Sequence, residues 1–178
     1  LQSPNSTVIV SKKRDFKAYD IDLEFEDEAL RRMAELAHEE HTGARGLQNV
    51  ADKMLLKYEK LLPDTDINRL VVTAEMVNHP KDELDRLLTN YYIKNFQRRF
   101  LAKNNIVITF TEEAIDLLKL KAEESKLKLD EVCSNMLQDY EYGLKLLGWE
   151  EFAVDADIVR NPKGRLEELI KKSYEKRS

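Results

Sequence analysis

The sequence predicts a predominantly helical α+β protein that contains the same small unit twice. Three segments recur in one order: Ile21–Leu30 aligns with Ile106–Ile115, and residues 54–59 and 74–84 align with 136–141 and 156–166. The first match lies 85 residues apart (Ile21 to Ile106) and the later ones 82 (Met54 to Met136). Recurrence at a fixed spacing is typical of repeated supersecondary units. We therefore predict a tandem duplication with one three-residue gap.

Each unit is expected to run strand, helix, helix, strand, helix. The opening strand alternates apolar Ile21, Leu23 and Phe25 with charged residues, which indicates one buried face. Two amphipathic segments follow, of which Gly43 ends the first and Pro63 the second. Leu70–Val72 is short and rich in β-branched residues, so it is expected to pair with the opening strand. Its counterpart is Phe152–Val154.

These periodicities predict domains and core residues. The expected domains are 1–20, a tail or extra strand with Val8–Val10; 21–83, the first unit; 84–104, a connecting helix; and 105–178, the diverged second unit. The expected core residues of the first copy are Leu30, Met33, Leu47, Met54 and Val71. Those of the second copy are Ile115, Leu118, Met136 and either Ala153 or Val154.

Composition narrows the class of protein. The chain has 178 residues, of which 42% are hydrophobic and 35% charged, enough to bury a core without disulfide or metal. The single cysteine, Cys133, fits a reducing compartment. No apolar run has the length of a membrane span or signal peptide, so no membrane contact is expected. The net charge of -5 argues against nucleic acid as a general partner. Because the chain begins with Leu1, we expect it to be cut from a longer protein.

The segment Gly43–Leu47 is the candidate functional site. It contains Arg45 at a helix start, where a guanidinium and the helix dipole could together bind a phosphate. Gly43 and Gly46 would permit close backbone approach. The sequence has no Gly-x-x-x-x-Gly-Lys-Ser/Thr loop of its own for nucleotide. The alternative is structural: Gly43 caps a helix, Arg45 is solvated, and Leu47 belongs to the core.

The order Phe25–Leu30, helix, Gly43–Leu47, Leu70–Thr73 resembles the C-terminal lid subdomain of Clp/HslU-type AAA+ unfoldases, most of all the ClpX lid. The resemblance covers residues 21–77, so the fold would be a tandem pair of lid-like units. It also implies that Arg45 is the sensor-2 residue, supported by Gly43, Ala44 and Gly46. Residues 93–100 are similar to the helix that enters the ClpX lid, so the second copy would own such a helix.

The resemblance further implies a parent protein. This would be a cytoplasmic, hexameric, ATP-driven unfoldase or protease ATPase subunit, with ATP and Mg²⁺ as cofactors that the present chain does not bind alone. The implied partners are the large AAA+ subdomain in cis and in neighbouring subunits, a protease, and protein substrates. The rival hypothesis is a stand-alone two-repeat protein-interaction module that uses no nucleotide.

The second copy departs from this pattern. Lys128–Val132 faces Gly43–Leu47 at the first spacing, so Asp130 would replace Arg45 and repel a phosphate, and Cys133 would face Gln48. This copy is expected to keep the fold and to serve packing, oligomer contact or partner docking.

Other patterns favour structural roles. His38 and His41 have the wrong spacing for a zinc helix, so no metal site is expected. Cys133 is interpreted as a structural thiol rather than a nucleophile. Trp149, with Leu146, Leu147 and Phe152, is either core or a partner surface. A basic stripe on the connecting helix would meet solvent or, alternatively, nucleic acid; its residues are Lys94, Arg98, Arg99 and Lys103.

Overall fold

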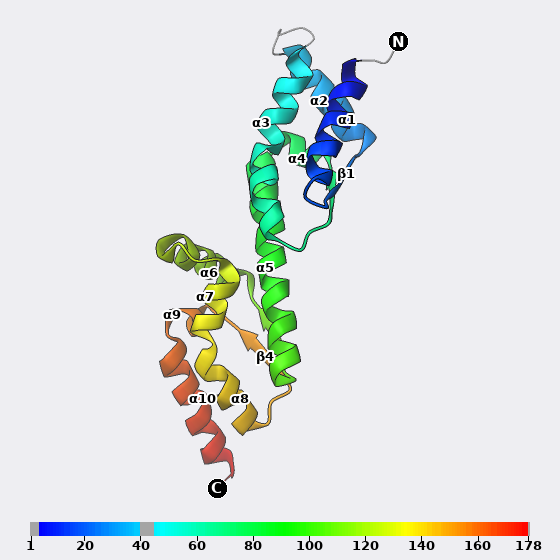
Figure 1. Ribbon diagram of the computed structural model, residues 1–178. Helices are drawn as coiled ribbons and strands as arrows, with labels where there is room; N and C mark the ends of the chain where they lie inside the picture. The colour runs from blue at the N-terminus through cyan, green and yellow to red at the C-terminus, as the bar shows by residue number, and fades with distance from the viewer. Residues whose placement is uncertain (1–3, 40–44, 178) are drawn as a thin grey trace. The chain divides into compact units, whose positions relative to one another are not determined.

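The computed structural model describes residues 4–39 and 45–177, and the chain divides into two compact units, Leu1–Leu87 and Leu88–Ser178 (Figure 1). Both units consist of helices around a two-stranded sheet, which confirms the predicted helix-rich α+β class. Unit 1 contains α1 (Pro4–Lys17), β1 (Asp22–Phe25), α2 (Asp27–Glu39), α3 (Gly46–Leu61), η2 (Leu62–Asp64), β2 (Arg69–Val72), α4 (Ala74–Asn78) and the first turns of α5 (Pro80–Asn104).

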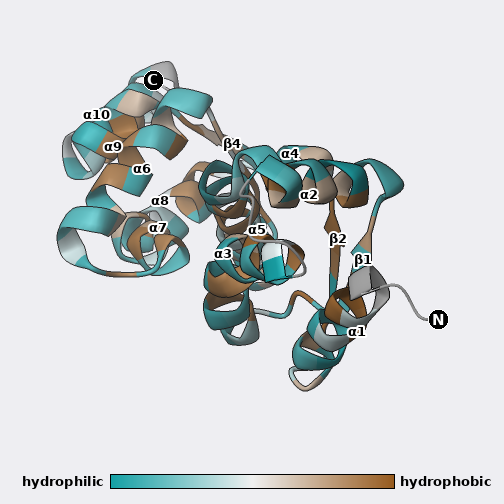
Figure 2. Ribbon diagram, turned by 90° about the horizontal axis from the view of Figure 1, so that it is seen from above, coloured by the Kyte–Doolittle hydropathy of each residue, from teal (hydrophilic) through white to brown (hydrophobic). Residues whose placement is uncertain are grey.

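The sheet of unit 1 is a parallel pair. Leu23 lies opposite Leu70, and Phe25 lies opposite Val72. Parallel neighbours cannot be joined by a tight turn and need a long crossover, which α2 and α3 supply. In Figure 2, which is coloured by hydropathy, β2 is mostly hydrophobic, as expected for a strand that helices cover.

Pro4–Lys17 form a helix, so the expectation of a loose tail or an extra strand in the segment 1–20 was wrong for these residues. Val8–Val10 reads as a short apolar run, which periodicity alone cannot assign to strand or helix. In the structure this run lies within α1, and Lys12 and Phe16 of α1 are buried at 6% and 1% exposure. Lys12 and Phe16 are four residues apart and therefore share a helix face.

Unit 2 has the same order of elements. After α5 come β3 (Val107–Phe110), α6 (Glu112–Ser125), α7 (Leu129–Met136), α8 (Gln138–Leu147), β4 (Glu151–Val154), α9 (Ala156–Arg160) and α10 (Pro162–Arg177). Its strands are also parallel, with Ile108 opposite Phe152 and Phe110 opposite Val154. The end of α5 leads into β3 as α1 leads into β1, so each unit has a leading helix.

Details recur at the same spacing. The hydroxyl of Tyr58 donates to the Pro80 carbonyl at 2.9 Å, and that of Tyr140 donates to the Pro162 carbonyl at 2.8 Å. Two residues just before the strands have left-handed backbones, Asp20 (φ 60) and Asn105 (φ 56). The two units therefore share geometry as well as element order, whereas their common ancestry stays a prediction.

The three-residue gap lies in the turn between the two crossover helices. Residues 40–45 separate α2 from α3, whereas only 126–128 separate α6 from α7. From there on, buried positions match at a spacing of 82: Leu47 with Leu129, Val50 with Val132, and Ala51 with Cys133. The structural counterpart of Arg45 is therefore Leu127, and the earlier alignment of Arg45 with Asp130, and of Gln48 with Cys133, was wrong.

Several predicted core residues are buried, among them Met33, Leu47, Met54, Leu118 and Val154. Leu30, Ile115 and Met136 are half-buried. Val71 was a wrong choice, because alternate residues of a strand face opposite sides and it is Leu70 and Val72 that face the core. Ala153 is exposed for the same reason.

We expect Tyr58→Phe and Tyr140→Phe each to lower the free energy of unfolding by about 1–2 kcal/mol, because each leaves a proline carbonyl without its donor while keeping the ring. Chemical denaturation followed by circular dichroism measures both effects, and the fluorescence of the single tryptophan, Trp149, reports unit 2. A loss below about 0.3 kcal/mol in both variants would contradict a stabilising role for these hydrogen bonds.

Candidate functional site: the turn that begins α3

Arg45 lies at the start of α3 with its side chain exposed to solvent. It is the N-cap residue, with φ −89 and ψ −11, and its side chain makes no capping hydrogen bond. The following residues, Gly46 and Leu47, are buried. The buried pair fixes the helix start on the core, while the guanidinium of Arg45 stays available to an anion.

The start of α3 carries no acidic residue in its first turn. The first backbone N–H groups of a helix have no intrahelical acceptor and carry partial positive charge. No residue in the first turn of α3 offsets this charge with a carboxylate, and Arg45 adds a full positive charge beside it. The arrangement is chemically suited to phosphate oxygens.

The rest of α3 is held firmly against α1. The ammonium of Lys12 lies 2.7 Å from Asp52 Oδ1 and 2.7 Å from Glu59 Oε1. Burial acts to lower the pKa of Lys12, but the hydrogen bonds to Asp52 and Glu59 outweigh it and raise that pKa. Lys12 therefore remains charged while buried. Sequence reasoning missed this contact because it assigned no helix to residues 4–17; the i,i+4 spacing of Lys12 and Phe16 was the available signal.

Part of the predicted motif lies outside the described residues. Gly43 and Ala44 fall in the range 40–44, as does His41 of the His38–His41 pattern. Over residues 4–39 and 45–177, no three His, Cys, Asp or Glu side chains are grouped as metal ligands would be. Of the predicted site residues, the structure therefore places Arg45 and Gly46, adjacent to each other at the start of α3.

The corresponding turn of unit 2 satisfies its helix start internally. The carboxylate of Glu131 accepts a hydrogen bond from the Lys128 backbone N–H at 3.0 Å. Asp130, also in the first turn of α7, is buried and lies 2.8 Å from the Arg99 guanidinium. Two carboxylates thus occupy the positive end of α7, which disfavours an incoming phosphate.

The structure shows the surroundings of the single cysteine and of the basic stripe. Cys133 is fully buried, and burial, followed by the charge of Asp130, raises the pKa of its thiol to about 12. Two of the four basic-stripe residues pair with carboxylates, Arg99 with Asp130 and Lys103 with Glu141. Arg98 of this stripe is exposed.

The tryptophan region divides between core and surface. Leu147 and Phe152 are buried at 8% and 6% exposure, as the core interpretation predicts. Leu146 and Trp149 are 46% and 38% exposed, so for these two the core interpretation was wrong. The Trp149 ring packs with one side on Phe152, with ring centroids 5.8 Å apart.

Membrane insertion finds no support in the helices. Within the described ranges, none combines the length and apolar character needed to span a bilayer. The longest, α5, has 25 residues but carries charged side chains throughout.

Most of unit 1 matches a known protein family. Residues 8–78 match the family model of the C-terminal, D2-small domain of ClpB protein. The chain is 30% identical over 101 residues to the ATP-dependent protease ATPase subunit HslU of Geobacillus kaustophilus (strain HTA426). That alignment covers 54% of this chain and 21% of the relative, so the chain corresponds to only a part of it. No solved structure matches the chain significantly. The likeness to ClpX in particular stays a prediction.

The thiol of Cys133 is expected to be unreactive in the folded protein. With a pKa of about 12, about one thiol in 10⁴ is ionised at pH 8, and the side chain is also buried. Alkylation by iodoacetamide at pH 8, followed by mass spectrometry, should therefore be slow in buffer and rapid in denaturant. Equal rates under both conditions would contradict a structural thiol.

Proposed function

We propose that the chain is the C-terminal lid region of an ATP-driven protein unfoldase or protease ATPase subunit of the Clp/HslU type, on the basis of the family match over residues 8–78 and the similarity to an HslU protein. In this proposal unit 1 couples the nucleotide state of the enzyme to motion of a ring. The observation that carries the proposal is Arg45, an exposed cation at a helix start without acidic residues, inside the segment that matches the family.

Arg45 is proposed to bind the phosphates of the nucleotide. Its guanidinium is permanently charged and forms paired hydrogen bonds to phosphate oxygens. The buried Gly46 and Leu47, together with the Lys12 contacts to Asp52 and Glu59, hold α3 in place, so that a pull on Arg45 moves the whole helix layer. Nucleotide binding would then reorient unit 1 as a body rather than deform a loop.

The cofactors of this proposal are ATP and Mg²⁺, bound by a large AAA+ subdomain in cis. Mg²⁺ would neutralise phosphate charge and the nucleotide would supply the free energy of hydrolysis. The residues of this chain contribute charge and positioning, since its sequence contains no phosphate-binding loop. Further partners in the proposal are the large subdomains of neighbouring subunits, a protease and protein substrates.

Unit 2 is proposed to be a diverged lid-like copy that does not contact nucleotide. Its crossover turn is shorter, Leu127 stands in the place of Arg45, and carboxylates occupy the start of α7. These differences favour a role in protein contacts. A stand-alone two-repeat interaction module remains the second candidate, and the exposed Leu146 and Trp149 are the observation that favours it.

In the protein that joins this chain to a large AAA+ subdomain, Arg45→Ala should lower nucleotide affinity or ATP turnover by about ten- to a hundredfold, the worth of one or two hydrogen bonds to a charged group. Steady-state ATPase assays and nucleotide titration measure the two quantities. Arg45→Lys should restore only part of the loss, because an ammonium cannot bind in a fork.

A matched control is Arg31→Ala, which removes an exposed arginine of α2 whose partner is the exposed Glu28. Both single variants should retain the unfolding free energy of the unaltered chain within about 0.5 kcal/mol, because both side chains are on the surface. Unchanged turnover and affinity in Arg45→Ala would refute the sensor role. A loss of the same size in Arg31→Ala would show a general charge effect instead.

A further inference from the structure

Each unit has an open groove at the same place, bounded by the end of its first crossover helix, the second crossover helix and the short helix after the second strand. The groove of unit 1 has a volume of about 220 Å³ and that of unit 2 about 530 Å³. Met54 and Pro80 line the first, and their counterparts Met136 and Pro162 line the second. The groove is therefore a feature that the two units share, and it is larger in unit 2.

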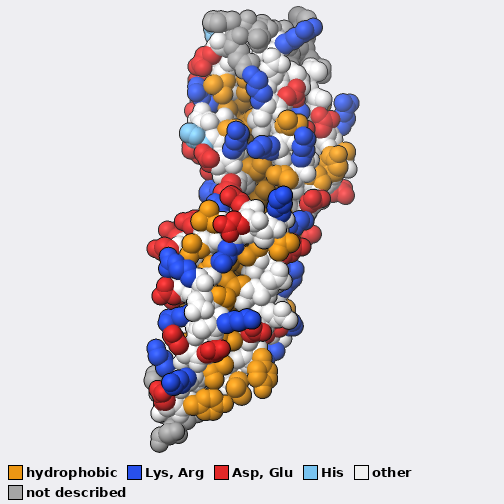
Figure 3. Space-filling view, turned by 90° about the vertical axis from the view of Figure 1, so that its left-hand side faces the viewer, with side chains coloured by type: hydrophobic (Ala, Val, Ile, Leu, Met, Phe, Trp, Pro, Cys, Tyr) orange, Lys and Arg blue, Asp and Glu red, His pale blue; other side chains and the backbone are white. Residues whose placement is uncertain are grey.

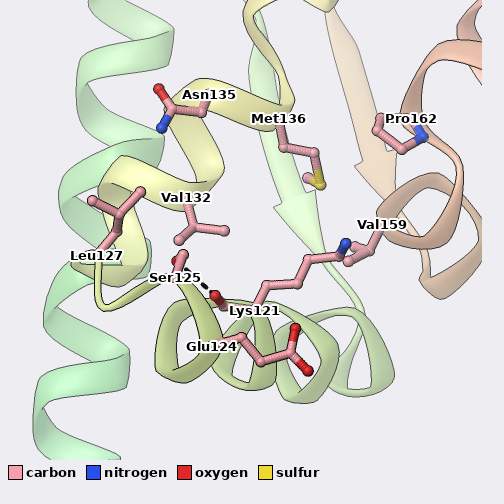
Figure 4. Close-up of a pocket in the computed structure, with 9 residues that line it drawn as sticks. All are labelled: Lys121, Glu124, Ser125, Leu127, Val132, Asn135, Met136, Val159 and Pro162. Carbon is pink, nitrogen blue, oxygen red and sulfur yellow. Dashed lines mark hydrogen bonds between the residues drawn. The ribbon is translucent and has the colours of Figure 1, made fainter.

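The groove of unit 2 combines apolar walls with one cation (Figure 4). Its apolar residues are Leu127, Val132, Met136, Val159 and Pro162. The Lys121 side chain runs along the groove with its nitrogen beside Val159 (Figure 4), where unit 1 has Leu36. Within the described part of the chain the Lys121 ammonium pairs with no carboxylate, and the Glu124 carboxylate is directed away from the apolar walls in Figure 4.

The second unexplained feature of unit 2 is an apolar stripe on α8 and the turn after it. Tyr142, Leu146 and Trp149 are 75%, 46% and 38% exposed. Tyr142 and Leu146 are four residues apart on α8 and share one side of it, and Trp149 follows in the turn after Gly148. Figure 3 shows hydrophobic side chains gathered near the lower end of unit 2, the end at which Figure 1 places the C-terminal part of α8. Unit 1 has Lys60 and Asp64 in place of Tyr142 and Leu146, so the stripe is specific to unit 2.

Two carboxylates border this stripe. Glu150 and Glu151 follow Trp149 directly, and neither forms an ion pair with another residue of the described ranges. Gly148, with φ +68, ends α8, and Trp149 and the two carboxylates follow it directly along the chain up to the first residue of β4. The stripe is thus an exposed apolar surface next to the negative charges of Glu150 and Glu151. The groove is an apolar surface next to the positive charge of Lys121.

We propose that the groove of unit 2 receives the Tyr142–Leu146–Trp149 stripe of a second copy of this chain, with Glu150 and Glu151 facing Lys121. The two surfaces are complementary in both apolar character and charge. A volume of about 530 Å³ lies in the range of pockets that enclose small ligands and accommodates one indole ring. Tryptophan is also the residue type most enriched among interface anchors.

The proposed contact joins two different surfaces of the chain. Figure 1 places the α6–α7 turn and the α8–β4 turn at opposite ends of unit 2, so one copy cannot satisfy its own groove. Two antiparallel copies can form the contact twice in a closed pair, whereas a head-to-tail pair leaves one groove and one stripe free and continues to a ring or an open chain. Its small area predicts weak, concentration-dependent association.

The test is sedimentation equilibrium of the 178-residue chain over a concentration series, with the emission of Trp149, the single tryptophan, recorded on the same samples. We expect the mean mass to rise with concentration and the emission to shift to shorter wavelength as the indole leaves water. Lys121→Glu and Tyr142→Ser should each raise the dissociation constant about tenfold or more. Lys172→Glu makes the same charge change at an exposed site on α10 and should leave the dissociation constant unchanged.

A mixing experiment tests whether the groove of one copy pairs with the stripe of another. Lys121→Glu spoils the groove and keeps the stripe, whereas Glu150→Lys with Glu151→Lys reverses the charge of the stripe and keeps the groove. Each variant alone should associate weakly, and an equimolar mixture should recover association. A chain that stays monomeric with constant emission at all concentrations overturns the proposal. So does association that Lys121→Glu and Tyr142→Ser leave unchanged, or a mixture that associates no better than its components.

Discussion

The parallel pairing of two four-residue strands is the constraint on which the rest of each unit depends. A parallel pair cannot be closed by a tight turn, so the chain must leave the sheet and return over it. Here the return takes two helices, α2 and α3 in unit 1. Two helices in the crossover create one turn between them, and that turn carries Arg45. The pairing also aligns Leu23 with Leu70, so that the strands bury one face against the helices.

The same crossover explains why the two units diverge where they do. Residues in the strands and on the inner helix faces are fixed by packing. The equivalent buried tyrosines, Tyr58 and Tyr140, also make the same hydrogen bond to a proline carbonyl. Arg45, by contrast, is exposed at the start of α3 and is not fixed by such packing. In unit 2 three fewer residues separate the two helices, and Leu127 stands in the place of Arg45. The Lys128 backbone N–H donates to the Glu131 carboxylate at the start of α7. Once that helix start is satisfied internally, it has no need of an external anion.

Sequence patterns predicted the paired strands and the helices between them. They did not predict the N-terminal helix or the position of the gap between the two units. Alternation at Leu23 and Phe25 and the recurrence of the two strand segments predicted the sheets, because burial on one face leaves a period of two in the sequence. The helix at residues 4–17 was missed because its apolar residues are few and its anchor is a buried lysine, Lys12, whose carboxylate partners lie 40 or more residues away. The position of the gap could not be predicted either. Cys133 and Ala51 become equivalent only when burial is known, since neither residue type identifies a core position on its own.

In unit 2 the polar groups at the start of α7 have partners within the unit, whereas the apolar groove is open and the aromatic stripe is exposed. The basic residue Arg99 and the acidic residue Asp130 neutralise each other at 2.8 Å, which removes charge from the end of α7. Unit 2 also has an apolar groove with Lys121 in its lining, larger than the groove of unit 1, and an exposed aromatic stripe followed by two carboxylates. Exposed aromatic side chains lower solubility unless a partner covers them, and contact between an apolar groove and water is unfavourable. The start of α7 in unit 2 therefore does not suit an anion, whereas the groove and the exposed aromatic side chains have the apolar character of surfaces that bind protein.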